Sequence, residues 1–443
     1  MQLNTLRQGF SHWMVKQLPP VFWRRRRWLN KTQWFYCQQL KEIQLRLLKN
    51  LVRHSYETVP YYRSLMDARG IRPGDIDSLE DIKQFPILSK ETVVEQGLRL
   101  VSTKYPKLLV RQAQTGGTTG KPVTLYRDVF SIANEHAFVR RQHDWAGIKM
   151  GQRCAHLMAR PIADPKKADG HLWDYDPIMK ELVFSTYHLS FENAKRYLAV
   201  MKSYGVRAIY AFPSAMNMLC HAYGEMAEVP RIESIMTTAE TLPETLKHRI
   251  EQTFRCPVFD SYGSSERVCY VFTCEFGTYH LQPEYGLTEF LPVGNRSTNE
   301  YRIISTGFWN RAMPLIRYDT GDVARLCDKQ CPCGRQFRTV ESIMGREGDV
   351  LVTKSGRRYG PAILTYLVRG TRNILESQII QDKIDHVTIE FVPTENFSSK
   401  DLEDFHKSIS KYLPDELGYG LKQVCKVKRT SGGKVRPVVS LLG

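Results

Sequence analysis

The stretch QTGGTTGKPVTLYRD, residues 114–128, combines residue types that bring backbone N–H groups and a positive charge close to a phosphate. It is not a Walker phosphate loop, because that loop has four residues between its glycines and a serine or threonine after its lysine. Here Pro122 follows Lys121, and a proline supplies neither an N–H group nor a hydroxyl for magnesium. The stretch therefore predicts a phosphate site of another kind.

Further polar loops follow the expected strands of a parallel sheet. From about residue 190 to residue 263, helical and extended patterns alternate, as in SFENAKRYLAVMKSYG followed by VRAIYAF, and this alternation predicts crossover helices. Ligands bind beyond the carboxyl ends of such strands. The loops expected there are TTAETL and SYGSSERV. Further along, RYDTGDVARL is expected to place Asp319, Gly321 and Asp322 in a turn.

The remaining patterns predict a second, smaller domain. Near Arg346 a Gly-rich stretch, IMGREGDVLVTKSG, leads into strands around one helix, with Ser398 or Ser399 as its N-cap. This part ends in SGGKVRPVVS, a glycine-rich loop that holds Lys434. The predicted domains are residues 1–345, of which 1–60 form a basic helical extension, and residues 346–443.

Taken in order, these motifs resemble those of the AMP-forming, acyl-adenylating enzymes. The order is a Gly/Thr loop ending in Gly-Lys-Pro, then Tyr-Gly-x-x-Glu, Tyr-x-Thr-Gly-Asp, Gly-Arg and a late Ser-Gly-Gly-Lys. RTSGGKVRPV and VPYYRSL are most similar to the phenylacetate–coenzyme A ligase branch, including its CapK-type members of capsule biosynthesis. The resemblance covers roughly residues 40 to 443. It implies a large α/β adenylating domain with parallel sheets and crossover helices, plus a small mobile α+β C-terminal domain.

The resemblance implies an ATP- and Mg²⁺-dependent ligase that converts a carboxylic acid to acyl-AMP and pyrophosphate. The acyl group then passes to coenzyme A or, as the alternative, to the amine of an amino sugar or amino acid in surface polysaccharide synthesis. Mg²⁺ prefers carboxylate and phosphate oxygens, which suits Glu266, and Asp322 can accept bonds from both ribose hydroxyls. The implied ATP- and AMP-binding residues are Thr115, Gly116, Gly117, Thr118, Thr119, Gly120, Lys121, Ala239, Glu240, Tyr262, Gly263, Ser264, Ser265, Asp322 and Arg346.

Lys434 is the predicted catalytic lysine, because a cation between the attacking carboxylate and the α-phosphate neutralises the charge that develops in the transition state. The catalytic set is Lys434, Glu266 and Lys121. By resemblance, the small domain pivots near GREGD, which makes Asp349 the hinge candidate. The acyl pocket is expected at the start of AFPSAMNML, at Phe212, Pro213 and Ser214.

A group of cysteines suggests a metal. TCEFGTYH contains Cys274 and His280, and CDKQCPCGR contains Cys327, Cys331 and Cys333. Thiolates with an imidazole suit tetrahedral Zn²⁺. The predicted ligands are Cys274, His280, Cys331 and Cys333, with Cys327 as the substitute, and four protein ligands would make the ion structural. Buried thiols without metal are the alternative.

The charge balance favours an anionic partner. The 443-residue chain has 63 Lys and Arg against 46 Asp and Glu, a net charge of +17. In PVFWRRRRWLN, Arg24–Arg27 stand between Trp23 and Trp28. Three readings are open: a basic helix packed on the protein body, peripheral contact with an anionic membrane, or nucleic-acid binding.

The expected location is the cytoplasm, with peripheral attachment at the inner face of the membrane as a further hypothesis. No signal peptide or membrane span is found in the sequence. A zinc-containing nucleic-acid-binding protein is another function class, but it explains neither the ordered loops nor Lys434, and no nucleic-acid partner is expected. A degenerate scaffold is a third class, and the presence of every expected functional residue argues against it. Homodimerisation is expected from the family.

Overall fold

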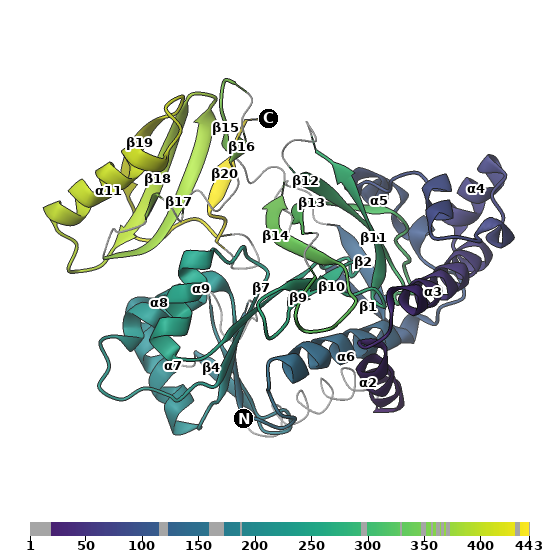
Figure 1. Ribbon diagram of the computed structural model, residues 1–443, viewed down its shortest axis with the longest axis horizontal. Helices are drawn as coiled ribbons and strands as arrows, with labels where there is room; N and C mark the ends of the chain where they lie inside the picture. Colours follow the sequence, from purple (N-terminus) through teal and green to yellow (C-terminus); the bar gives the residue numbers. More distant parts are fainter. Residues whose placement is uncertain are drawn as a thin grey trace. The chain divides into compact units, whose positions relative to one another are not determined.

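A computed structural model describes most of the chain (Figure 1). It describes the following residues: 19–114, 123–158, 172–186, 188–293, 299–327, 330–346, 351–355, 358–359, 364, 367–368, 373–429 and 435–442. These residues form two compact units. The first unit comprises Met1–Lys149, Pro177–Met179 and Ser261–Ile343, and the second comprises Met150–Asp176, Lys180–Asp260 and Met344–Gly443.

The second unit contains the parallel sheet that the alternating pattern predicts. Its strand order is β8-β7-β6-β3-β5-β4, and β5, β3, β6 and β7 pair in parallel. These strands are β3 (Cys154–Leu157), β4 (Trp173–Asp176), β5 (Glu181–Phe184), β6 (Ala208–Ala211), β7 (Ser234–Thr238) and β8 (Val258–Gly263). Nearly every position of β3, β6 and β7 is buried, as expected where both faces of a strand are covered.

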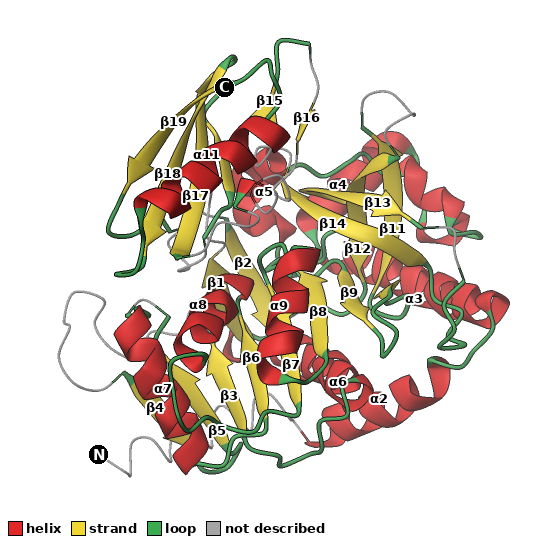
Figure 2. Cartoon of the chain, turned by 60° about the vertical axis from the view of Figure 1, so that its left-hand side comes forward, coloured by secondary structure: helices red, strands yellow, loops and turns green. Residues whose placement is uncertain are grey.

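Three crossover helices lie side by side on one face of these strands (Figure 2). They are α7 (Phe191–Ser203), α8 (Pro213–Tyr223) and α9 (Glu244–Phe254). Ser190 caps α7 by accepting a hydrogen bond from the Asn193 N–H, and Pro213 occupies the first turn of α8, where its missing N–H has no partner to lose. The helices bury Leu198, Leu219 and Ile250 in one apolar core with the strands.

The C-terminal segment of the second unit forms its own sheet and core. The order β19-β18-β17-β20 is covered on one face by α11, as predicted for strands around one helix. The elements are β15 (Leu351–Val352), β16 (Arg358–Tyr359), β17 (Ile374–Lys383), β18 (His386–Pro393), α11 (Ser399–Tyr412), β19 (Gly418–Gln423) and β20 (Val438–Ser440). Ser398 is the N-cap, and Asp401 completes a capping box with it.

The first unit begins with helices whose apolar sides are buried. These are α2 (Pro19–Thr32), α3 (Cys37–Thr58), α4 (Pro60–Arg69), α5 (Lys90–Gln96) and α6 (Val129–Trp145), with 3₁₀ turns at Pro73–Asp75, Glu80–Gln84, Gly97–Leu100 and Lys107–Leu109. Strands β1 (Val110–Gln114) and β2 (Thr124–Asp128) pair antiparallel.

The strands of the first unit pair antiparallel, whereas β5, β3, β6 and β7 of the second unit pair in parallel. Their order is β11-β12-β13-β14-β10-β9, and the end of β8 pairs with β9. They are β9 (Tyr270–Thr273), β10 (Tyr279–Leu281), β11 (Gly286–Pro292), β12 (Glu300–Gly307), β13 (Tyr318–Leu326) and β14 (Thr339–Arg346). Tyr62, Phe85 and Ile303 belong to the core that these strands share with α3 and α4.

One local prediction is wrong. Asp319, Gly321 and Asp322 were expected in a turn, but they lie within β13. The register of β12 and β13 shifts between Arg302 and Ile304, so that extra residues of β13 bulge out, with Gly321 at a φ of 70°. A β-bulge bends the strand and redirects side chains next to it, and glycine accepts the left-handed conformation without strain.

The basic segment forms α2, and its four arginines differ in environment. Arg25 lies 3.5 Å above the ring of Trp309 and donates to Asn134 Oδ1 at 2.8 Å. Arg26 pairs with Asp144 at 3.3 Å. Arg24 and Arg27 are exposed. Half of the basic run therefore packs on the protein body, as the first reading expected, and the other half faces solvent.

Candidate active site

The carboxyl ends of β6 and β7 bring an acidic residue to the start of α8. Ala239, directly after β7, has a φ of 68°, a left-handed conformation that is unfavourable for a residue with a Cβ. This turn directs Glu240 towards Ser214. The carboxylate of Glu240 accepts hydrogen bonds from the Ser214 N–H at 2.9 Å and the Ser214 hydroxyl at 3.0 Å. Phe212 and Pro213, the other predicted acyl-pocket residues, are buried beside it.

Two predicted nucleotide-binding residues are in direct contact in the first unit. Tyr262, near the end of β8, donates its hydroxyl hydrogen bond to Asp322 Oδ2 at 2.7 Å. Burial, and then the negative charge of Asp322, hold the pKa of Tyr262 well above its usual value, so the phenol stays protonated and remains a donor. The β13 bulge thus places Asp322 against a side chain 60 residues earlier in the sequence.

Gly263 is required for a reason that the sequence did not indicate. It was expected to let the backbone approach a nucleotide. A Cβ at this position would lie 2.9 Å from Tyr270 Cδ2, closer than carbon atoms approach without a shift. The glycine therefore makes room for the ring of Tyr270 on the neighbouring strand β9.

Glu266, the predicted Mg²⁺ ligand, accepts a hydrogen bond from the Tyr318 hydroxyl at 3.1 Å. The Arg127 side chain donates to the backbone oxygen of Ser265 in the same loop. Burial, and then the neighbouring Arg267, lower the pKa of Arg127. Tyr318 and Arg127 were not predicted as site residues, although both stand in quoted motifs, because a motif shows order along the chain and not contact across it.

Some of the remaining predicted residues are described and others are not. Outside the described residues lie the Gly/Thr loop from Thr115 to Lys121, the hinge candidate Asp349 and the catalytic candidate Lys434. Arg346 is the last residue of β14. Ser264 lies in the loop after β8, and its hydroxyl is buried with no partner among the described residues.

The four predicted zinc ligands lie together in the first unit. The ligand atoms of Cys274, His280, Cys331 and Cys333 are all within 4.8 Å of one another. Cys274 Sγ is 3.5 Å from Cys331 Sγ, and Cys333 Sγ is 3.4 Å from His280 Nε2. These separations suit atoms that share one tetrahedral ion. Cys327 is not part of this group, and all ten cysteines are free.

The local environment keeps the histidine of this group in its ligand form. Burial, and then the nearby Arg335, lower the pKa of His280 to about 4. Its imidazole is therefore neutral at neutral pH, and a neutral ring nitrogen is what binds a metal. The β9–β10 hairpin presents Cys274 and His280, whereas Cys331 and Cys333 lie just before β14.

Comparison with known proteins identifies the family. The AMP-binding enzyme family matches residues 180–309, and the CapK C-terminal domain matches residues 351–440. Protein CapK of Staphylococcus aureus is 24% identical over 411 residues, which cover 90% of this chain and 89% of that protein. Phenylacetate-coenzyme A ligase of Thermus thermophilus is 23% identical over 446 residues, covering 91% and 97%. These matches show that the chain is similar to the AMP-forming, acyl-adenylating enzymes, in the CapK and phenylacetate-coenzyme A ligase branch.

A solved structure of another protein has the same fold as this chain. 2-Hydroxyisobutyryl-CoA ligase in the postadenylation state, in complex with 2-HIB-AMP, matches with a TM-score of 0.71 at 19% identity. The match covers 92% of this chain and 90% of that chain. The predicted family resemblance, the α/β fold class and the class of AMP-forming ligase are confirmed.

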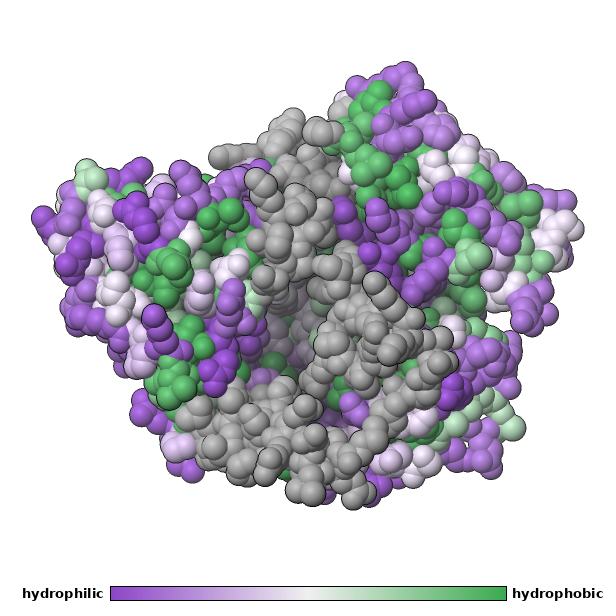
Figure 3. All heavy atoms as spheres, turned by 180° about the vertical axis from the view of Figure 1, so that it is seen from behind, coloured by the Kyte–Doolittle hydropathy of each residue, from purple (hydrophilic) through white to green (hydrophobic). Residues whose placement is uncertain are grey.

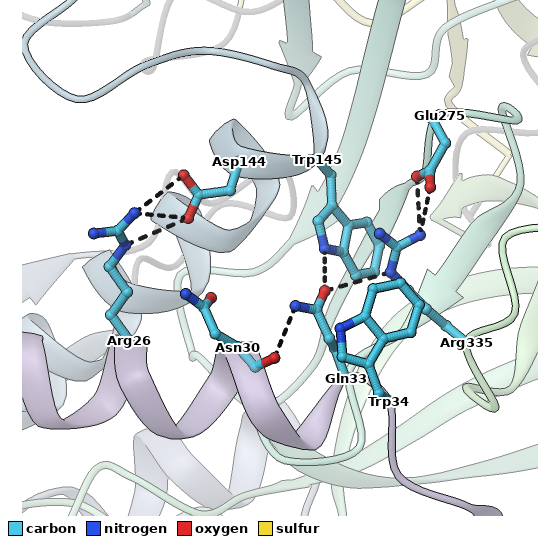
Figure 4. A pocket seen from close by; sticks show the side chains of 8 residues that line it. All are labelled: Arg26, Asn30, Gln33, Trp34, Asp144, Trp145, Glu275 and Arg335. Carbon is cyan, nitrogen blue, oxygen red and sulfur yellow. Dashed lines mark hydrogen bonds and ion pairs between the residues drawn. The ribbon is translucent and has the colours of Figure 1, made fainter.

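Next to the cysteine group, the enzyme has a polar pocket of about 490 Å³ (Figure 4). The guanidinium of Arg335 lies 3.9 Å from the ring centre of Trp145 and 4.9 Å from that of Trp34, and it pairs with Glu275 at 2.9 Å. Gln33 Oε1 accepts the Trp145 indole N–H at 2.8 Å. Glu275 and Arg335 are close in sequence to the cysteines. The contact of Arg335 with Trp34 therefore connects the residues after α2 to the candidate metal group.

Proposed function

We propose that this enzyme adenylates a carboxylic acid and passes the acyl group to coenzyme A. A carboxylate oxygen attacks the α-phosphorus of ATP, the bond to the β-phosphate breaks, and pyrophosphate leaves. The thiol of coenzyme A then attacks the acyl carbon and displaces AMP. The observation that carries the proposal is the Tyr262–Asp322 contact at 2.7 Å with Glu266 in the adjoining loop, because it joins two family motifs at one place.

The side chains have separate roles in this proposal. The Tyr262 ring stacks on adenine, and its hydroxyl orients the Asp322 carboxylate, which accepts the ribose hydroxyls. Glu266, steadied by Tyr318, would hold Mg²⁺, which neutralises phosphate charge when bound. The Gly/Thr loop and Lys121 bind the β- and γ-phosphates, and Lys434 stabilises the charge at the α-phosphorus.

The domain boundary stays a proposal as well. Residues 346–443 would move about Asp349, which withdraws Lys434 after adenylation and admits the acceptor. The match of the CapK C-terminal domain to residues 351–440 supports treating this segment as one module.

The acyl acceptor has one alternative. The similarity to protein CapK along 90% of the chain supports transfer to an amine in surface polysaccharide synthesis. The relatives named phenylacetate-coenzyme A ligase support coenzyme A. Once the acid is known, a release assay for AMP with coenzyme A, amino sugars and amino acids in parallel separates the two acceptors.

The remaining proposals concern metal, location and assembly. Zn²⁺ would be held by Cys274, His280, Cys331 and Cys333, with no position left for substrate, and would act as a structural ion. We propose a cytoplasmic enzyme with peripheral contact to anionic membrane. We also propose a homodimer, and light scattering measures its mass in solution. None of the described helices is long and apolar enough to cross a membrane.

ATP–pyrophosphate exchange without any acceptor tests the central proposal. A panel of aryl, hydroxy and amino acids is supplied with ATP, Mg²⁺ and labelled pyrophosphate, and exchange is expected with one acid or a small group of related acids. Lys434→Ala should nearly abolish exchange and spare thioester formation from supplied acyl-AMP. Normal exchange by this variant would refute the role of Lys434, and no exchange by the wild type with any acid would count against adenylation.

A further inference from the structure

The carboxylate of Glu240 has a third donor that comes from the C-terminal segment. Besides its two bonds from Ser214, Oε1 accepts the backbone N–H of Val435 at 2.9 Å. All three residues belong to the second unit. Val435 follows Lys434 directly in the sequence. Glu240 therefore holds the residue next to the predicted catalytic lysine, although the two lie 195 positions apart.

Glu240 is well suited to this task. The Ser214 N–H belongs to the first turn of α8, an 11-residue helix whose N-terminus favours a negative charge. The left-handed turn at Ala239 fixes the direction of the side chain. Burial raises the pKa of Glu240, and the hydrogen bonds from Ser214 and Val435 oppose that rise.

The base of the Lys434 loop also has a scaffold of its own. Arg429 and Val435 form a backbone bridge, which brings the two ends of the loop together. Gln378 on β17 donates to the Arg436 backbone oxygen at 2.7 Å and to that of Lys428 at 3.2 Å. Because these partners lie in the C-terminal segment, the loop base stays formed when the bond to Glu240 opens.

A second bond joins the same two parts of the unit. Asn217, one turn further along α8, donates to the Leu375 backbone oxygen at 2.8 Å. Arg249 on α9 donates to the Asn217 side-chain oxygen at 3.3 Å and so orients this amide. Loss of the Glu240–Val435 bond alone therefore frees the loop base without detaching β17 from α8.

We propose that Glu240 is a positioning residue, a latch that holds Val435 and thereby places Lys434 for adenylation, and that opens for acyl transfer. This inference rests on the proposed function. It differs from the expectation that Glu240 binds the nucleotide, because its carboxylate oxygens already accept bonds from Ser214 and Val435. A latch affects the rate of adenylation, whereas a nucleotide ligand affects the KM for ATP.

Val435→Pro tests the latch directly, since proline lacks the N–H that Glu240 accepts. Val435→Ala is the matched control, because it shortens the side chain and keeps the N–H. We expect Val435→Pro to lower kcat for ATP–pyrophosphate exchange about 10- to 100-fold, the range for a lost hydrogen bond to a charged group, with an unchanged KM for ATP. Thioester formation from supplied acyl-AMP should match that of Val435→Ala.

A double variant separates the latch from general damage. In the Glu240→Ala background, Val435→Pro should lower kcat no further, because the bond is already lost. Additive losses, a raised KM for ATP, or equal loss in both half-reactions would overturn the proposal. The melting temperature of Val435→Pro shows whether this variant folds.

Amide hydrogen exchange supplies a test that needs no activity. In the peptide containing Val435, Glu240→Ala should speed exchange at the Val435 amide, and unchanged protection at that amide would overturn the latch. Failure of the proposed function and failure of the latch give different results. If the wild type shows no pyrophosphate exchange while Val435 is protected through Glu240, the proposed function fails. If the wild type is active and Val435→Pro behaves as Val435→Ala, the latch fails.

Discussion

At the residue scale, side chains that are distant in sequence act in pairs. Asp322 has an oriented carboxylate because Tyr262 donates to one of its oxygens at 2.7 Å. Glu266 is held in the same way by Tyr318. Such bonds to charged groups are stronger than those between neutral groups. A tyrosine hydroxyl therefore sets the position of each of the two acidic residues assigned here to ribose and magnesium.

Tyr262→Phe is expected to weaken ATP binding. The ring for adenine remains, but Asp322 loses the donor that orients it, so the KM for ATP in pyrophosphate exchange should rise about 5- to 50-fold. The matched control is Tyr56→Phe, which removes a similar hydroxyl bond to Asp67 at 2.9 Å on the surface of the same unit. A rise in KM of the same size in both variants would contradict the assignment.

At the element scale, the β9–β10 hairpin and the loop before β14 depend on each other through the cysteine group. Arg335, near Cys333, and Glu275, beside Cys274, extend this junction to Trp34, which follows α2, and to Trp145 at the end of α6 (Figure 4). Ligands from separate segments convert metal affinity into folding stability. A metal here would therefore stabilise both the hairpin and the N-terminal helix packed beside it.

Zinc removal is expected to destabilise the protein. Protein purified without chelator should hold about one zinc per chain, and its removal should lower the melting temperature by about 5 to 10 °C. Cys331→Ser should have the same effect, whereas Cys425→Ser, an exposed cysteine outside the group, should have none. A zinc-to-protein ratio near zero would contradict the site.

Helix α8 contributes a pH dependence through His221. Burial, and then Arg249, lower the pKa of His221 to about 4, below its usual value of 6.5. Between these values the unfolded chain binds a proton that the folded chain does not, so stability falls as the pH drops from about 6.5 to 4. The loss attributable to this residue is up to about 3 kcal/mol.

Denaturant unfolding at several pH values measures this contribution. The free energy of unfolding of His221→Gln should fall less than that of the wild type between pH 6.5 and 4, because glutamine does not titrate. The exposed His248, one turn from Gln252 on α9, provides a control, and His248→Gln should follow the wild type. If the free energy of unfolding changes with pH in the same way for His221→Gln and the wild type, His221 is not the source of the pH dependence.

At the scale of the whole molecule, two of the arginines that contribute to the net charge of +17 face solvent on α2. Arg25 and Arg26 are engaged with Trp309 and Asp144, but Trp23, Arg24 and Arg27 face solvent. On the coloured part of the face in Figure 3, hydrophobic side chains lie in separate groups among hydrophilic ones. Membrane contact would thus depend on the outward side of α2.

Arg24→Ser with Arg27→Ser is expected to lower binding to anionic liposomes about 10- to 30-fold in a flotation assay, with melting temperature unchanged. Lys41→Ser with Arg53→Ser removes the same charge from exposed positions of α3 and is the matched control. Substitution of all four arginines is less informative, because loss of Arg25 damages the packing on Trp309. Equal binding by the two double variants would contradict membrane contact through α2.

The sequence by itself determined the family, the order of the motifs and the crossover helices. Each of α7, β6, α8, β7 and α9 was predicted because the periodicity that indicates it lies within the element itself. The capping box of Ser398 is equally local. The candidate zinc ligands were also recognisable, since cysteine spacing limits which residues can share an ion.

Only the tertiary structure decided how these parts meet. Asp322 lies in a bulged strand and not in a turn, because a bulge is defined by the partner strand β12. The packing of Arg25 depends on Trp309, and the role inferred for Glu240 depends on Val435. The antiparallel pairing of β10 with β14 likewise joins distant segments. Local patterns carry no record of these contacts, because each is formed by long-range packing of the folded chain.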